Sequence, residues 1–272
     1  MKKILLFLLI NIFLISSAFA TDWTSDANCQ AAWLMEVDED PLTDSSGNGL
    51  TAAHVGSPTH LTASPPDTYS TGYYDMNGSS DAFSVANAGA LRFDTNTGDP
   101  DFSIIWWMAP DVINDYKHIF DFTDGTNDGW RILIWNNGVL YVSLDEVDTL
   151  SAGSVFSVGV WVHCAGTYDR DGNITIYING VSSGTPQSIS GNGMNITTTT
   201  LDFGYTGVSQ FFNGDFDEVA MFDKLVNSTE VNDIIDNGLA GAAAGWTHDW
   251  NGISGVDING VPNANMAKVN GI

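Results

Sequence analysis

The most informative stretch of the sequence is residues 161–180, which read WVHCAGTYDRDGNITIYING. Aromatic and β-branched residues are frequent in its two apolar runs, residues 161–168 and 174–178, and the polar segment 169–173 separates these runs. Aspartate, asparagine and glycine tolerate the backbone conformations of tight turns. The stretch therefore predicts two antiparallel strands joined by a hairpin turn.

Short apolar runs separated by turn residues continue over most of the chain. Further strands are expected at residues 32–37, 82–85, 102–108, 118–121, 130–135, 139–144, 200–203 and 216–222. A second hairpin is expected at Asn136, Asn137 and Gly138. One short helix is expected after Asn227, which is a suitable N-cap, and it ends at Gly238. One helix is too little for alternating strands and helices, so the pattern favours an all-β sandwich.

Four stretches, in this order, resemble the pattern of bacterial laminin-G-like domains, which are relatives of pentraxins and legume lectins. They are residues 32–36 with the loop 44–49, residues 101–110, residues 161–181 and residues 212–222, and the third is the most specific. The resemblance covers roughly residues 30 to 240. It implies a concanavalin-like jelly-roll β-sandwich of two antiparallel sheets with one short C-terminal helix.

The sequence predicts three segments. Residues 1–20 have a basic start, an apolar run and the small-residue exit Ala18-Phe19-Ala20, which is typical of a cleaved secretory signal. Residues 21–240 form the sandwich, and residues 241–272 are a linker and a short strand-turn repeat. No second apolar segment follows, so we expect an exported protein, secreted or at the cell surface, without a transmembrane anchor.

The chain is strongly acidic, with a formal net charge of −25 and only eight Lys and Arg residues. Such a charge repels nucleic acids and anionic membranes, so neither is expected as a partner. The acidic residues are scattered among Gly, Asn, Ser and Thr, which indicates a solvated surface. Cys29 and Cys164 leave two alternatives open, a disulfide in an exported protein or buried free thiols.

The sequence contains no complete catalytic constellation, so we expect a protein that is not an enzyme. Laminarinase-type hydrolases of the concanavalin-like superfamily carry two Glu and an Asp on one strand. The segments that begin at Glu36 and Glu146 imitate the start of that motif, but neither supplies the second Glu at the right spacing. The five histidines are scattered, and His163 is expected to be a packing residue.

Calcium is the better-supported chemistry, because it prefers carboxylate, amide and carbonyl oxygens presented by polar loops. The first and last strands of this fold commonly pair. We therefore expect Asp44, Asn48 and Asp217 to share a structural Ca²⁺. The alternative is that Asp44 is an ordinary turn residue and that Asp217 forms only local hydrogen bonds.

A glycan is the expected ligand, because aromatic rings stack on sugars and polar loop groups bind hydroxyls. The candidates are Trp130, Asp124, Asn127 and Asp128, although most tryptophans of a sandwich are packing residues. The leading hypothesis is a secreted, non-catalytic carbohydrate-binding or adhesion module. The alternative is a structural or protein-interaction component of a cell surface or virion that docks through its C-terminal segment, and a glycan-cleaving enzyme ranks third.

Overall fold

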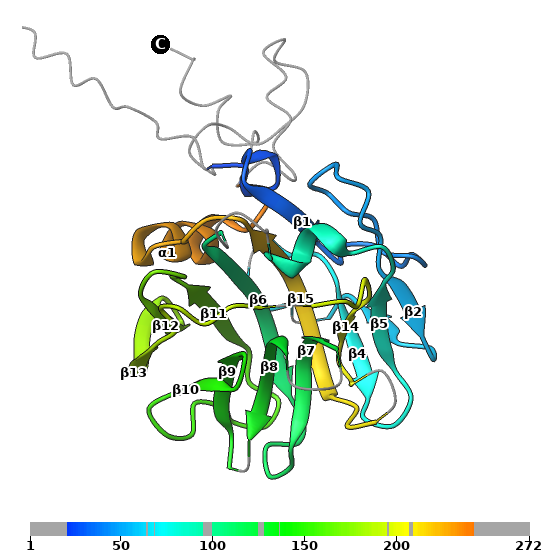
Figure 1. The fold of residues 1–272 in the computed structure, drawn as a ribbon. Coiled ribbons are helices and arrows are strands. Elements are labelled where there is room, and N and C mark those ends of the chain that lie inside the picture. Colours follow the sequence, from blue (N-terminus) through cyan, green and yellow to red (C-terminus); the bar gives the residue numbers. More distant parts are fainter. Residues whose placement is uncertain are drawn as a thin grey trace, which may run out of the picture.

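The computed structural model describes residues 21–63, 65–67, 69–94, 100–124, 128–135, 137–194, 196–206 and 209–241. The expected signal peptide and the C-terminal segment from residue 242 onward lie outside these ranges. Within them, no helix is both long and apolar enough to cross a bilayer. The described residues form two antiparallel sheets that lie one over the other (Figure 1).

The larger sheet has eight strands. Seven of them lie in the order β13 (Val181–Ser188), β12 (Asn173–Ile178), β11 (Val162–Tyr168), β6 (Phe102–Pro110), β15 (Asn213–Phe222), β4 (Tyr73–Asn77) and β3 (Thr59–Leu61), and the eighth is β1 (Cys29–Trp33). Strand β1 pairs with the second half of β15, and β4 pairs with its first half. The opening and closing strands of the domain therefore lie side by side.

The second sheet has seven strands. Their order is β10 (Val147–Leu150), β9 (Val139–Leu144), β8 (Gly129–Trp135), β7 (Lys117–Thr123), β14 (Leu201–Phe203), β5 (Ala82–Val85) and β2 (Ala53–Val55). Besides the strands, the described residues form two short 3-10 helices, η1 (Trp23–Ser25) and η2 (Gly89–Arg92), and one α-helix near their C-terminal end.

Side-chain alternation along β6 sets the two apolar layers of the protein. Ile104, Trp106 and Met108 point into the core between the sheets, while Ile105 points to the outer face of the eight-stranded sheet. Aromatic rings fill much of the core between the sheets, and the rings of Phe102 and Tyr168 stack with centroids 4.0 Å apart.

A second, smaller apolar cluster covers part of the outer face of the eight-stranded sheet. Helix α1 (Ser228–Asn237) packs Val231 and Ile234 against it. The helix begins with a capping box, because the Asn227 side chain accepts from the Glu230 backbone and Glu230 accepts from the Asn227 backbone. The helix start predicted at Asn227 is confirmed.

The jelly-roll sandwich predicted from the sequence is confirmed, as are both hairpins, β8–β9 and β11–β12. The prediction missed β2, β3, β4, β10 and β13. It also extended the opening strand to residue 37, whereas β1 ends at Trp33.

The two cysteines are free, and they lie on opposite sides of one sheet. Cys164 belongs to the core between the sheets, and Cys29 belongs to the outer cluster beneath α1. A disulfide needs the two Cα atoms within about 7 Å and side chains that point toward each other. The structure therefore favours the second of the two alternatives, buried thiols.

We expect Ellman's reagent to find no reactive thiol in the native protein and two thiols per chain after unfolding without a reductant. In the native protein, burial hides the thiols from the reagent and raises the pKa of Cys29 to about 12, and unfolding exposes both thiols because the cysteines are not paired. Fewer than two thiols in the unfolded, unreduced chain would show that the cysteines had paired.

Candidate functional site

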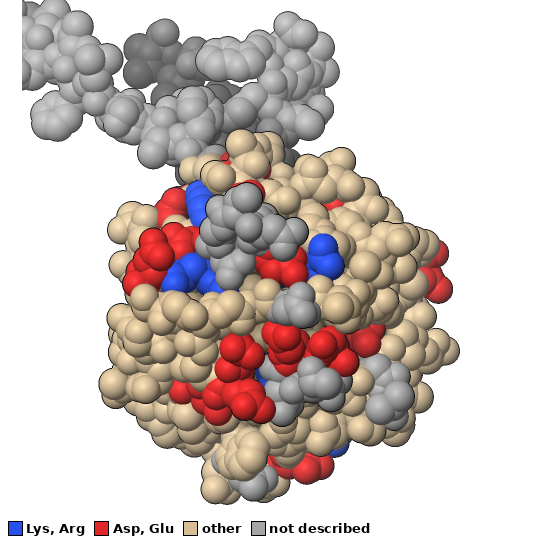
Figure 2. Space-filling model, in the orientation of Figure 1, with Lys and Arg blue, Asp and Glu red and all other residues tan. Residues whose placement is uncertain are grey.

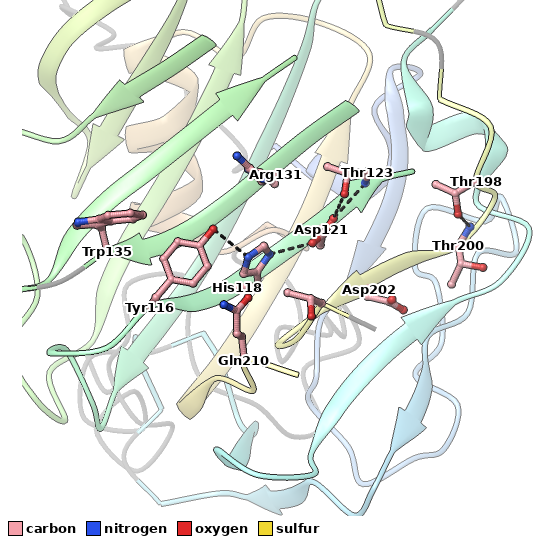
Figure 3. A pocket seen from close by; sticks show the side chains of 11 residues that line it. Tyr116, His118, Asp121, Thr123, Arg131, Trp135, Thr198, Thr200, Asp202 and Gln210 are labelled. Atoms are coloured by element: carbon pink, nitrogen blue, oxygen red, sulfur yellow. Dashed lines mark hydrogen bonds and ion pairs between the residues drawn. The ribbon is translucent and has the colours of Figure 1, made fainter. Parts of the chain in front are cut away.

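A groove with a volume of about 760 Å³ lies on the outer face of the seven-stranded sheet. Figure 3 shows Tyr116 and Trp135 at one end of it and Thr198 and Thr200 at the other, with His118 between them. Its remaining lining comes from β7, β8, β14 and the segment after β14, and comprises Asp121, Thr123, Arg131, Asp202, Thr206 and Gln210. The volume is in the range of small-molecule binding sites.

Alternation along β8 decides which of its two tryptophans reaches the groove. Trp130, Ile132 and Ile134 point into the core, so Arg131 and Trp135 point outward. Trp135 is 45% exposed, which is unusual for a large apolar residue in the part of the chain that the structure describes. β8 thus places one aromatic ring and one cation on the same face.

A β-bulge brings His118 into the groove. His118 pairs with Leu133 and Phe120 pairs with Ile132, so Ile119 is an extra residue in β7. Ile119 turns into the core, and His118 therefore shares the outer face with Asp121. A regular strand would have placed His118 on the same face as Phe120, which is buried.

His118 links an aromatic and an acidic residue of the groove. Its Nδ1 lies 2.9 Å from Asp121 Oδ2, and its Nε2 lies 3.2 Å from the Tyr116 hydroxyl (Figure 3). Asp121 also accepts hydrogen bonds from the backbone and hydroxyl of Thr123. The chain of contacts holds the Tyr116 ring and the Asp121 carboxyl in fixed orientations.

Aromatic rings cluster at one end of the groove. Trp135 stacks on Tyr141 at 5.9 Å between centroids, and Tyr116 meets Trp135 edge to face at 5.1 Å. Because its neighbours hold the Trp135 ring in place, little conformational entropy remains to be lost when a ligand stacks on it.

Two carboxylates lie opposite each other across β7 and β14, where Asp121 pairs with Asp202. Burial raises the pKa of Asp121, but hydrogen bonds from His118 and Thr123 outweigh this effect and hold its pKa below the usual value. Burial and, less strongly, the nearby Asp121 raise the pKa of Asp202.

Figure 2 shows that acidic side chains also gather in the middle of the face in view, so an anionic ligand is disfavoured.

The structure corrects part of the predicted ligand site. Trp130 is fully buried and donates from its indole nitrogen to the Leu91 carbonyl at 3.0 Å, so its ring is a core residue. Asp124 follows the end of β7 and Asp128 precedes the start of β8, and the Asp124 amide donates to the Asp128 carbonyl. Asn127 lies outside the described residues.

The three residues predicted to share calcium belong to two separate hydrogen-bond networks. Asp44 accepts from the backbone amides of Ala32, Ser46 and Leu50, so its carboxylate organises its own loop against β1. Asn48 donates to two backbone carbonyls of β1. Neither contacts Asp217, which accepts a hydrogen bond from Ser70.

Asp217 instead lies in an acidic cluster with Glu36, Asp67 and Glu218, in which Asp217 and Glu218 are buried and Glu36 and Asp67 are half-buried. Burial raises the pKa of Asp217 well above its usual value, and proximity to Glu218 adds to the shift. Burial, with repulsion from Asp67, raises the pKa of Glu218 to about 8. Among the residues that the structure describes, no group of three or more His, Cys, Asp or Glu side chains is found that could hold a metal ion.

The sequence matches the family described as the concanavalin A-like lectin/glucanases superfamily over residues 70–232. A search of curated proteins found no match. The matched segment contains β7, β8 and β14, the three strands that build the groove.

Solved structures share the fold at low sequence identity. The binding domain of Paraclostridial Mosquitocidal Protein 1 has a TM-score of 0.62 and 18% identity, and the match covers 76% of this chain and 52% of that one. Domain 4 of the extracellular arabinanase AbnA from Geobacillus stearothermophilus, solved with arabinotriose, has a TM-score of 0.58 and 16% identity, with coverages of 76% and 98%.

A third similar structure is the binding domain of botulinum neurotoxin DC in complex with rat synaptotagmin II. Its TM-score is 0.59 at 18% identity, with coverages of 77% and 51%. The chain thus spans about half the length of the two toxin binding domains.

We expect Trp130→Ala and Trp135→Ala to differ sharply in stability. Trp130→Ala leaves a cavity in the core and should lower the free energy of unfolding by about 3–5 kcal/mol. Trp135→Ala removes a half-exposed ring and should cost less than ~1 kcal/mol. Urea denaturation measures both, and equal losses would mean that the two rings are equally buried.

Proposed function

Because the chain belongs to the concanavalin A-like lectin/glucanases superfamily, we propose that it is a carbohydrate-binding module that holds a neutral glycan in the groove over β7, β8 and β14. The observation that carries the proposal is the exposed Trp135 ring at one end of a polar groove. A sugar presents C–H groups on one face and hydroxyls around its edge, so it needs both kinds of contact.

The polar residues of the groove suit the hydroxyls of a sugar. Asp121 and Asp202 supply acceptors, Arg131 supplies donors, and Gln210 supplies both. The acidic surroundings favour a neutral glycan over a uronic-acid or sulfated polymer. The arabinanase domain that shares this fold was solved with arabinotriose, a neutral oligosaccharide, which is consistent with such a ligand.

The proposal includes binding without cleavage. Asp121 is engaged by His118 and Thr123, and Asp202 accepts from Ser84 at 2.8 Å, so both carboxylates already support neighbouring side chains. The sequence layout of residues 1–20 supports an exported protein, which would meet polysaccharides outside the cell.

A glycan array followed by calorimetry tests the binding proposal. We expect one class of neutral oligosaccharide to bind, and Trp135→Ala to weaken its affinity at least about tenfold, which corresponds to ~1.4 kcal/mol. The matched control is Leu225→Ala, which trims an exposed apolar side chain outside the groove and should leave affinity unchanged.

If the wild-type protein binds none of the neutral glycans on the array, the proposal is contradicted. A protein partner is then favoured, as in the synaptotagmin complex of the toxin domain. Unchanged affinity of Trp135→Ala would move the binding site away from the groove.

Cleavage is tested separately by reducing-sugar release from the polysaccharide that binds. We expect none. Release that Asp202→Asn abolishes would make the groove a catalytic site, and release that Glu36→Gln or Glu146→Gln abolishes would place catalysis elsewhere.

A further inference from the structure

A second groove, with a volume of about 530 Å³, lies where the edge strands β10 and β13 meet. It is lined by Asp148, Leu150 and Ser151 on one side and by Gly184, Thr185 and Gln187 on the other. Its volume is in the range of small-molecule binding sites. The lining combines polar side chains with the apolar side chain of Leu150, which is 44% exposed.

A β-bulge in β13 closes this second groove against β10. The register between β12 and β13 shifts between Ile174 and Ile176, where four residue steps on β13 lie opposite two on β12. Gly184 lies in this bulge at a φ of 81°, and a Cβ on it would collide with the Leu150 carbonyl oxygen. The backbone of β13 therefore approaches the backbone of β10, and the edges of the two sheets meet there.

The second groove shares a face of the seven-stranded sheet with the first groove. Alternation along β9 places Val142 in the core and Tyr141 on the outer face. Leu150 of β10 pairs with Tyr141, and residues directly opposite each other share a face. Tyr141 in turn stacks on Trp135 at 5.9 Å between centroids. An apolar row thus runs from Trp135 in the first groove through Tyr141 to Leu150 in the second.

A polar row runs beside the apolar row and also connects the two grooves. It consists of residues that pair directly across β14, β7, β8, β9 and β10, which are Asp202, Asp121, Arg131, Ser143 and Asp148. Burial and, next, the neighbouring Asp148 carboxyl raise the pKa of Tyr141, so the two rows are in contact at β9 and β10. Figure 1 shows β7, β8, β9 and β10 side by side. From β14 to β10 the polar row crosses four strand spacings of about 4.8 Å, or about 19 Å in all.

We propose that the carbohydrate site extends along these two rows into the second groove, so that its ligand is an extended neutral polysaccharide chain that lies across the strands. The inference rests on the proposed function, because it concerns the same ligand. Sugar units that stack on Trp135 occupy the first groove. Units further along the chain lie against Leu150, and their hydroxyls meet Asp148 and Gln187.

A long chain suits this surface better than a small ligand does. The apolar and polar contacts are spread over a distance of about 19 Å instead of being gathered around one point. Sugar units bound in the first groove hold the following units close to the second groove, so binding there becomes an intramolecular step. Affinity should therefore depend on the length of the chain.

Calorimetry with a length series of the neutral oligosaccharide that binds best tests the extension. We expect affinity to rise at least about tenfold from the disaccharide to chains that span both grooves, and then to level off. The double variant Leu150→Ala/Gln187→Ala removes an apolar and a polar contact of the second groove. It should weaken the longest chains about tenfold and the disaccharide far less, because two units at Trp135 leave most of the second groove empty.

Val181→Ala is the matched control, since Val181 is an exposed aliphatic residue of β13 outside the second groove. It should bind every chain length like the wild type. Equal affinity for all lengths, or an unchanged affinity of the double variant for the longest chains, would overturn the extension. Weaker binding by Trp135→Ala would still support the first groove in that case. If no neutral glycan binds at all, the extension and the proposed function are both overturned.

Discussion

Strand β15 is the constraint on which the rest of the structure depends. It pairs with β6 along one edge and with β4 and then β1 along the other, so it joins the beginning, middle and end of the domain in one sheet. Its inward side chains, including Phe216 and Met221, belong to the core between the sheets, and Ala220 and Phe222 belong to the cluster beneath α1. Both apolar layers thus meet on a single strand.

Two β-bulges bring polar side chains together on the outer faces of the two sheets. The bulge in β15 turns Glu218 out of the core to join Asp217, and the bulge in β7 turns His118 outward to join Asp121. Each bulge converts an alternating strand into one that presents neighbouring polar groups on the same face. The two resulting groups of polar side chains lie on the outer faces of opposite sheets.

Sequence patterns predicted those parts of the fold that obey strict alternation. Strand β6 carries a long apolar run, the β11–β12 hairpin has clear turn residues, and the N-cap residue Asn227 marked the start of α1. Strands β3 and β13 were missed because they are short or largely exposed, which removes the apolar signal. The polar, exposed character of β13 also protects the edge of its sheet from pairing with another chain.

The candidate sites were harder to predict for a physical reason. Trp135 could have been chosen over Trp130 from the sequence, because Trp130 shares its parity with Ile132 and Ile134 while Trp135 shares its parity with Arg131. The positions of His118 and Glu218 could not be predicted from the sequence, because a bulge inserts one residue without changing the composition of the strand. Strand alternation alone assigns both residues to the wrong face.

Nuclear magnetic resonance of the tryptophan indole groups tests the glycan site most directly. The Trp135 signal can be assigned from its loss in Trp135→Phe, and the wild-type protein is then titrated with the glycan that binds best. We predict a saturable shift of the Trp135 indole signal with little change in that of Trp130. A bound glycan that leaves the Trp135 signal unchanged would contradict the assignment of the groove as the binding site.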